Sequence, residues 1–158
     1  MGYILGANLT ATYSAEALQN SGDGFGVGDV YTADTGKVYK FVRFDNGTDN
    51  VAAVAGNVCY YLAATGAETN TVTSDLSSSD NIGAGMFMSV PADGSYCWIQ
   101  TKGAATLTTA LTAGANGNAL TAAGATDGTL DVSLAVTDFI CGVAVDAAAK
   151  KVILNCPM

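Results

Sequence analysis

Near the end of the chain stands the stretch Asp138-Phe139-Ile140-Cys141-Gly142-Val143-Ala144-Val145-Asp146-Ala147-Ala148-Ala149-Lys150-Lys151-Val152-Ile153-Leu154-Asn155. Its two apolar runs, 139–145 and 151–155, flank a short turn, a pattern typical of a β-hairpin. A second hairpin is predicted upstream, where runs 85–90 and 95–101 flank the turn Pro91-Ala92-Asp93-Gly94. Proline and glycine at these places favour a type I turn. The last third of the chain is therefore expected to be β-structure.

Other short strands are predicted over 30–32, 37–44, 58–62, 71–73, 106–111, 117–121 and 129–132. Many short strands separated by turn residues are typical of a β-barrel or a β-sandwich. Helix is expected only over 14–19 and over 50–55, where Thr48 or Asp49 can cap the start and Gly56-Asn57 can end it. A single helix over 50–64 is the alternative. The predicted fold class is mainly β, with at most one or two short helices.

The length of 158 residues indicates one domain with a possible extra segment. Residues 1–28 are interpreted as an extended N-terminal arm, since their apolar residues follow no clean period and glycine recurs through 22–28. Residues 29–158 are expected to form one β-rich domain, with barrel strands over about 85–158. The polar segment 63–82 is expected to be a surface loop with an edge strand over 71–73. The apolar anchors of the arm are Tyr3, Ile4, Leu5, Leu9, Tyr13 and Phe25.

Charge narrows the possible partners. Only 13% of the residues are charged, and the net charge is −8. So acidic a chain is not expected to bind nucleic acid, whose phosphates require Lys and Arg contacts, or an anionic membrane surface. No signal peptide or membrane-spanning segment is predicted. A low density of charge is instead typical of a protein that functions in an assembly with other proteins.

The residue types needed for catalysis are scarce. The chain contains no His, which excludes Ser-His-Asp and Cys-His sites. The four Cys form no C-x-x-C pair, so we expect buried, reduced thiols and not a zinc site. Most Asp residues stand in turns, where Asp supports the local backbone. A calcium site in the glycine-rich segment 23–29 and a carboxylate-pair hydrolase are weaker alternatives. We expect no enzyme and no cofactor.

Two further groups of residues are candidates for contact with a partner. Lys37, Lys40 and Arg43 hold half of the six basic residues. Strand alternation puts Lys37 and Arg43 on one face and Lys40 on the other. They form either a solvated strand edge that resists aggregation or a contact to an acidic rim on a neighbouring protein. The aromatic candidates for sugar binding are Tyr31, Tyr39, Tyr60, Tyr61 and Trp98, although Trp98 is expected in the core or in an interface.

Three segments together resemble the head-decoration, or capsid cement, proteins of tailed phages. The first is Val90-Pro91-Ala92-Asp93-Gly94-Ser95-Tyr96-Cys97-Trp98-Ile99-Gln100-Thr101-Lys102-Gly103, with its sequel Ala104-Ala105-Thr106-Leu107. The second is Thr112-Ala113-Gly114-Ala115-Asn116-Gly117-Asn118-Ala119-Leu120, and the third is Ile140-Cys141-Gly142-Val143-Ala144-Val145-Asp146-Ala147-Ala148-Ala149. They are similar to the family's proline–glycine turn with its aromatic strand, its glycine turn, and its closing Gly-Val-Ala strand.

The resemblance implies a small β-barrel or β-tulip that forms a homotrimer on the outer surface of an icosahedral capsid. The partner would be the major capsid protein, and the protein would be made in the host cytoplasm and located in the virion. Residues 1–28 would be the arm that reaches over coat subunits, and 63–82 would face solvent or the trimer apex. Expected capsid contacts are the six anchors of the arm together with Lys37, Lys40 and Arg43. Another virion component (a head-fibre base or a tail protein) and a carbohydrate-binding β-module remain the alternatives.

Overall fold

The computed structural model describes residues 7–158 of the chain. Its helices are α1 (Ala15–Asn20) and α2 (Gly66–Thr69), with a 3₁₀ turn over Leu76–Ser78. Its strands are β1 (Thr12–Tyr13), β2 (Val30–Thr32), β3 (Val38–Asp45), β4 (Val58–Leu62), β5 (Thr71–Thr73), β6 (Ser79–Phe87), β7 (Tyr96–Thr106), β8 (Ala119–Thr121), β9 (Asp131–Val132), β10 (Ile140–Asp146) and β11 (Lys151–Asn155). The described chain is mainly β with two short helices, as the sequence predicts.

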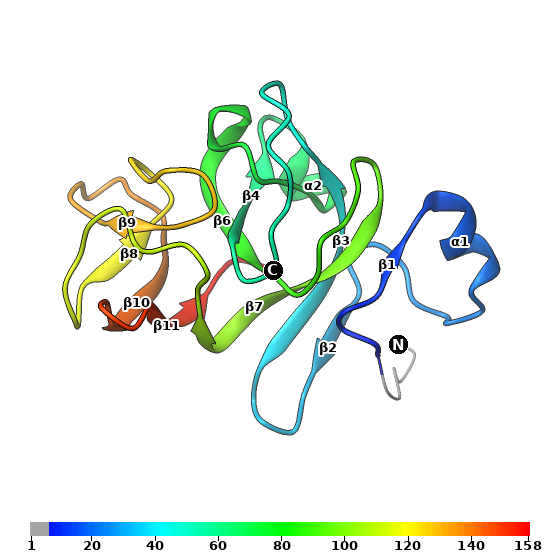
Figure 1. Ribbon diagram of the computed structural model, residues 1–158, viewed down its shortest axis with the longest axis horizontal. Helices are drawn as coiled ribbons and strands as arrows, with labels where there is room; N and C mark the ends of the chain where they lie inside the picture. The colour runs from blue at the N-terminus through cyan, green and yellow to red at the C-terminus, as the bar shows by residue number, and fades with distance from the viewer. Residues whose placement is uncertain (1–6) are drawn as a thin grey trace.

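Five strands close into a mixed β-barrel. Their order around the ring is β3-β5-β4-β6-β7, and the pairing of β3 with β7 completes the circle. The pair β3–β5 is parallel, whereas the other pairs of the ring are antiparallel. Figure 1 shows these strands at the centre of the molecule, between the N-terminal segment and strands β8–β11. The predicted β-barrel is confirmed.

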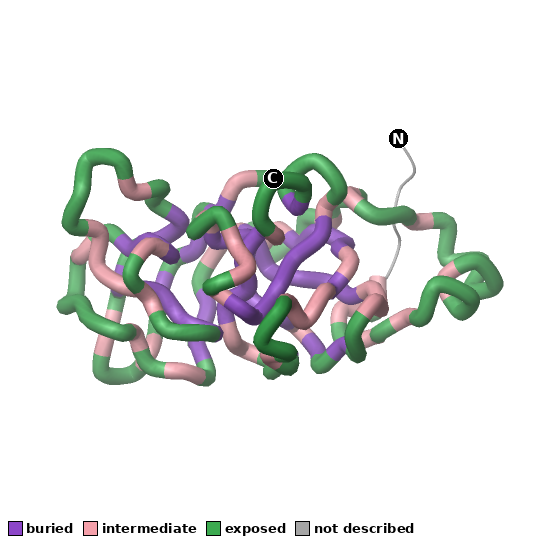
Figure 2. Tube along the Cα trace, turned by 90° about the horizontal axis from the view of Figure 1, so that it is seen from above, coloured by how far each residue is buried: buried purple, intermediate pink, exposed green. Residues whose placement is uncertain are grey.

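The interior of the barrel follows from the two-residue period of its strands. Val42 and Phe44 alternate along β3 with outward-facing residues, and they pack with Cys59, Ile99 and other residues in one buried cluster. Phe44 meets Phe87 edge to face across this interior, with 5.5 Å between ring centroids. Figure 2 shows that the buried residues follow the central strands, while the loops and the N-terminal segment are largely exposed.

Strands β8–β11 extend the same sheet beyond the barrel. The eleven-residue strand β7 pairs with β3 and β6 over its first part and with β11 over its second. Strands β10, β8 and β9 follow in order, and a second core of buried residues, including Tyr60, Leu120 and Leu154, lies beneath them. The closed ring is thus built within residues 38–106, and the strands after Thr106 are an extension. The boundary of about 85–158 expected for the barrel strands was therefore misplaced.

Four local predictions were wrong. No helix forms over 50–55 or 50–64; β4 occupies 58–62, as the preferred reading expected. Segment 63–82 is no surface loop, because Thr71, Thr73 and Asp75 are buried. Strand β5 is central and not at an edge, since it lies between β3 and β4. The strand expected over 106–111 does not form: β7 continues through Gly103 at φ +100° and ends at Thr106, and residues 107–111 are in no strand.

Candidate protein-interaction surfaces

The N-terminal segment 7–28 packs on the barrel of its own chain. Tyr13 in β1 and Phe25 in the following loop lie against Phe41 and Trp98 on the outer face of β3 and β7. The ring centroid of Phe25 is 4.8 Å from that of Phe41 and 5.3 Å from that of Trp98, both edge to face. Leu9 is half-buried against the same cluster. These aromatic contacts form because the large rings of β3 and β7 would otherwise be exposed on the outside of the barrel.

Three of the predicted arm anchors, Leu9, Tyr13 and Phe25, are therefore brought together. The other three, Tyr3, Ile4 and Leu5, lie outside the described residues. Short elements hold the segment: β1 pairs with β7 through Thr12 and Tyr13 only, and α1 buries no residue. Ser14 caps α1 by accepting a hydrogen bond from the Ala17 N–H.

The structure separates the three basic residues that the sequence grouped. Lys40 is buried within the barrel, and Arg43 lies outside, 4.0 Å from the carboxylate of Asp45. Lys37 precedes β3 and packs its stem over Gly103. The solvated-edge interpretation is wrong, because β3 is paired on both sides by β2, β5 and β7. The three side chains do not form one patch.

Lys40 has polar contacts but no carboxylate partner within residues 7–158. Its ammonium donates a hydrogen bond of 3.0 Å to the hydroxyl of Tyr61 and lies 5.3 Å from the centre of that ring. The hydroxyl of Tyr61 in turn donates to the carbonyl of Pro157 at 3.1 Å. Burial lowers the pKa of Lys40 and raises that of Tyr61. Lys40 is therefore part of the barrel interior, and its head group is not presented to a partner.

The aromatic residues considered for sugar binding are mostly buried. Tyr39, Tyr60, Tyr61 and Trp98 are buried, which confirms the core position expected for Trp98. Tyr31 is half-buried and stacks on Tyr39 with 6.2 Å between centroids. An exposed platform of these residues, as the sugar-binding reading requires, is absent from the described chain.

Several carboxylates lie in the loops at one end of the barrel. The Asp49 N–H donates to Asp75, the Asn46 N–H to Asp93, and the Leu76 N–H to Asp127. Burial disfavours ionisation of Asp75, but hydrogen bonds from the Ser77 hydroxyl, the Asp49 N–H and other donors outweigh it and lower its pKa to about 2. Through these hydrogen bonds Asp75 holds the loops together, so its role is structural.

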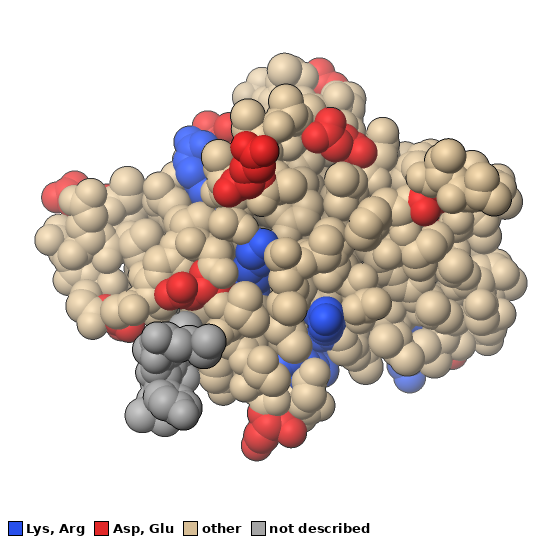
Figure 3. Space-filling model, turned by 180° about the vertical axis from the view of Figure 1, so that it is seen from behind, with Lys and Arg blue, Asp and Glu red and all other residues tan. Residues whose placement is uncertain are grey.

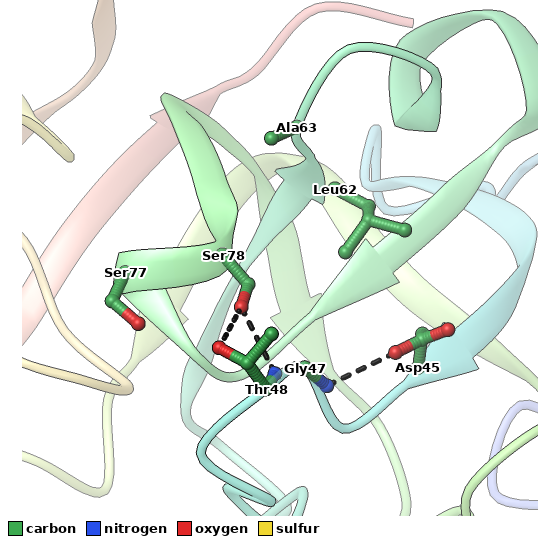
Figure 4. Close-up of a pocket in the computed structure, with 7 residues that line it drawn as sticks. All are labelled: Asp45, Gly47, Thr48, Leu62, Ala63, Ser77 and Ser78. Atoms are coloured by element: carbon green, nitrogen blue, oxygen red, sulfur yellow. Dashed lines mark hydrogen bonds between the residues drawn. The ribbon is translucent and has the colours of Figure 1, made fainter.

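A shallow hollow opens at this end, shown in Figure 4. It is lined by Asp45, Gly47, Thr48, Leu62, Ala63, Ser77 and Ser78. The Ser78 hydroxyl lies 3.0 Å from both the backbone nitrogen and the hydroxyl of Thr48, and the Gly47 N–H donates to Asp45. The polar groups drawn there are thus largely engaged with one another.

The outer face of β10 and β11 is apolar and uncovered. Val143 and Ile153 are Cα partners in the ladder, and they are 41% and 50% exposed. Val145 stands at the irregularity between Ala144 and Asp146 and is 48% exposed. The opposite face of the same strands is buried through Cys141, Ala144, Val152 and Leu154. An antiparallel sheet with one solvated face normally carries polar residues there.

This surface was not predicted from the sequence, although the signal was present. Both β10 and β11 carry aliphatic residues at consecutive positions, and not at alternate ones. Strands of this kind are covered on both faces. The intramolecular core covers only one face, so the other is available to a partner.

All four Cys residues are buried, and none is in a disulfide. Burial raises the pKa of Cys59, and it raises that of Cys97 to about 12. They pack as small apolar groups, as expected.

Within residues 7–158, no group of three or more Cys, Asp and Glu side chains is arranged to hold a metal ion. The same residues include no helix with the length and hydropathy needed to span a bilayer. Comparison with protein-family models, curated proteins and solved structures finds no match to this chain.

Proposed function

We propose that this protein is a structural virion component that decorates an icosahedral phage capsid. It binds the outer surface of coat subunits, acts as a homotrimer and stabilises the shell. The observation that carries the proposal is the exposed apolar face of β10 and β11, with Val143, Val145 and Ile153 at its centre. A contiguous apolar surface of this kind is typical of a protein that functions in an assembly.

The segments that carry the resemblance support the proposal, since they form connected parts of one sheet. Residues 90–103 supply the turn before β7 and most of that strand, and residues 140–149 supply β10 and the turn after it. With only 13% charged residues, the chain suits closely packed contacts. Attachment through many copies is avid even where each contact is weak.

In this proposal the N-terminal arm has two parts. Leu9, Tyr13 and Phe25 contact the barrel and anchor the base of the arm. Tyr3, Ile4 and Leu5 are assigned the contact with coat subunits. Arg43 and Lys37 are secondary contacts, and Lys40, which is buried in the barrel, is assigned no contact with coat subunits.

The experiment is re-addition of purified protein to heads that lack it, followed by sedimentation of the heads. We expect saturable binding with a fixed number of copies per coat subunit, and heads that are more resistant to heating. A chain without residues 1–22 keeps all five strands of the closed barrel. It should remain folded and fail to bind. Heads that take up no full-length protein would contradict the proposal, and normal binding of the truncated chain would contradict the role of the arm.

A further inference from the structure

The barrel separates its charges along the direction of its strands. Strand β3 starts just after Lys37 and ends at Asp45, and β7 runs antiparallel beside it from the Asp93 turn towards Lys102. Seven residue steps separate the two ends of β3, which is about 23 Å. Lys37 and Lys102 therefore lie at one end of the β3–β7 ladder, and Asp45 and Asp93 lie at the other. Figure 3 shows several Asp and Glu side chains over the upper part of this side of the molecule, with further carboxylates at its left and lower edges, and most Lys and Arg side chains across the centre and lower part.

The lysine end continues into the apolar face of the C-terminal strands. We name this surface the lysine-rimmed face; its centre is Ala104, Val143, Val145 and Ile153, and its rim is Lys37, Lys102 and Lys151. Register places Ala104 opposite Ile153, which is opposite Val143. In antiparallel pairs, opposite residues share a face of the sheet, so these three form one apolar row.

A surface hollow joins the centre of this face to its rim. Lys37 and Lys151 line it together with Ala104, Thr106 and Val145. Lys102 stands two residues before Ala104 in β7, opposite Asn155. Within residues 7–158, none of the three lysines makes a salt bridge. Half of the six basic residues of a chain with net charge −8 therefore surround one exposed apolar surface. Asp146, the Cα partner of Lys151, and Asp34, in the turn before Lys37, lie near this rim, but neither forms a salt bridge with the three lysines.

The opposite end offers a surface of complementary charge. We name it the acidic end; it consists of the carboxylates of Asp45, Asp49, Asp80, Asp93 and Asp127. Hydrogen bonds between loops hold Asp49, Asp80, Asp93 and Asp127 in place, and Arg43 lies 4.0 Å from the carboxylate of Asp45. Val90, which is 62% exposed and three residues before Asp93, adds an apolar side chain beside this end.

We propose that copies of this chain associate head to tail, with the lysine-rimmed face of one copy on the acidic end of the next. The occupant is a second copy because the chain itself carries both complementary surfaces. A ring with threefold symmetry requires such a contact, since each interface in it joins two different patches. The inference depends on the proposed function in one respect only, namely that the protein forms a trimer. Its test uses isolated protein, so its failure leaves the binding of heads untouched.

The test is sedimentation velocity of the purified full chain over a range of concentrations and salt. The natural protein should associate, and added salt should weaken the association. Lys102→Glu with Lys151→Glu should weaken it about tenfold or more, because like charges then face each other. Asp49→Lys with Asp93→Lys should do the same. Circular dichroism and thermal melting establish that each variant is folded. Asp49→Lys alone is the milder substitution, since its carboxylate accepts only a 3.2 Å bond from the Ser77 hydroxyl.

The decisive variant combines all four substitutions in one chain. Its net charge is again −8, and each swapped face meets a swapped partner, so association should return. The matched control combines the two lysine substitutions with Glu16→Lys and Asp29→Lys on the N-terminal segment. It also has the natural net charge, and it should stay dissociated. If the variant with all four substitutions associates and the control does not, the result supports the head-to-tail contact. A monomeric natural protein, an unaffected lysine variant, or a folded four-fold variant that does not reassociate would each overturn it.

Discussion

The ammonium of Lys40 and the hydroxyl of Tyr61 are joined by a 3.0 Å hydrogen bond inside a closed β-barrel. A buried ammonium without a carboxylate is costly, and removing its remaining partner is costlier still. The bond links β3 to β4, two strands that are separated in the ring by β5. The Tyr61 hydroxyl also donates to the Pro157 carbonyl, so the same pair ties the C-terminal segment to the barrel.

Tyr61→Phe should lower the free energy of unfolding by about 1–3 kcal/mol, because the ammonium loses its hydrogen-bond partner. Lys40→Met should leave stability unchanged or raise it, since the substitution removes a buried charge. In the Lys40→Met background, Tyr61→Phe should lower the free energy of unfolding by a smaller amount. Urea unfolding of the four proteins at pH 7 measures this coupling. Equal costs of Tyr61→Phe in both backgrounds would show that the contact contributes nothing.

Asp75 should make the stability depend on pH in the acid range. Its folded pKa of about 2 lies below the unfolded value of about 3.9. The unfolded chain therefore binds the proton first, and the contribution of Asp75 is complete above pH 4 and lost as the pH falls through 2. Asp75→Asn should cost about 1–3 kcal/mol at pH 7. The difference from the natural protein should shrink between pH 4 and pH 2.

Denaturant unfolding from pH 2 to 7 checks this dependence. The control is Asp34→Asn in the exposed turn between β2 and β3, which should change stability by less than about 0.5 kcal/mol. If the cost of Asp75→Asn were the same at pH 2 and pH 7, the carboxylate would not be the group that holds the loops.

Phe25 should hold the N-terminal segment on the barrel. Its ring contacts both Phe41 and Trp98, so Phe25→Ala should destabilise the protein by about 1–3 kcal/mol, somewhat less than for a fully buried ring. Hydrogen exchange of the amides of 12–28 should accelerate with little change in β4 and β6. Phe139→Ala is the matched control, because Phe139 is 44% exposed and should tolerate truncation. Equal effects of the two substitutions would contradict the anchoring role.

Local contacts explain which parts of the fold are readable from the sequence. The β10–β11 hairpin is predicted well because turn residues join neighbouring strands. The β6–β7 hairpin is predicted in part, since β6 spans 79–87 and not 85–90. Strand β5 was assigned to an edge because its threonines are polar, yet its parallel pairing with β3 buries them. That pairing joins residues nearly thirty positions apart, which no local pattern records.

The candidate surfaces, too, are only partly predictable from local sequence patterns. Alternation along β3 correctly places Lys40 with Val42 and Phe44. The charge of Lys40 then suggested solvent, whereas that face is the barrel interior and Tyr61 supplies a partner. The lysine-rimmed face was missed because Lys37, Lys102 and Lys151 are far apart in sequence and meet only through the pairing of β3, β7 and β11.

The central claim, decoration of a capsid, is tested most directly by the copy number of this chain in particles purified from its source. Quantitative mass spectrometry would compare the chain with the major coat protein of the same particles. The account predicts near-equal copy numbers. A few copies per particle would contradict it in favour of a fibre or tail component, and absence from the particles would contradict a virion role altogether.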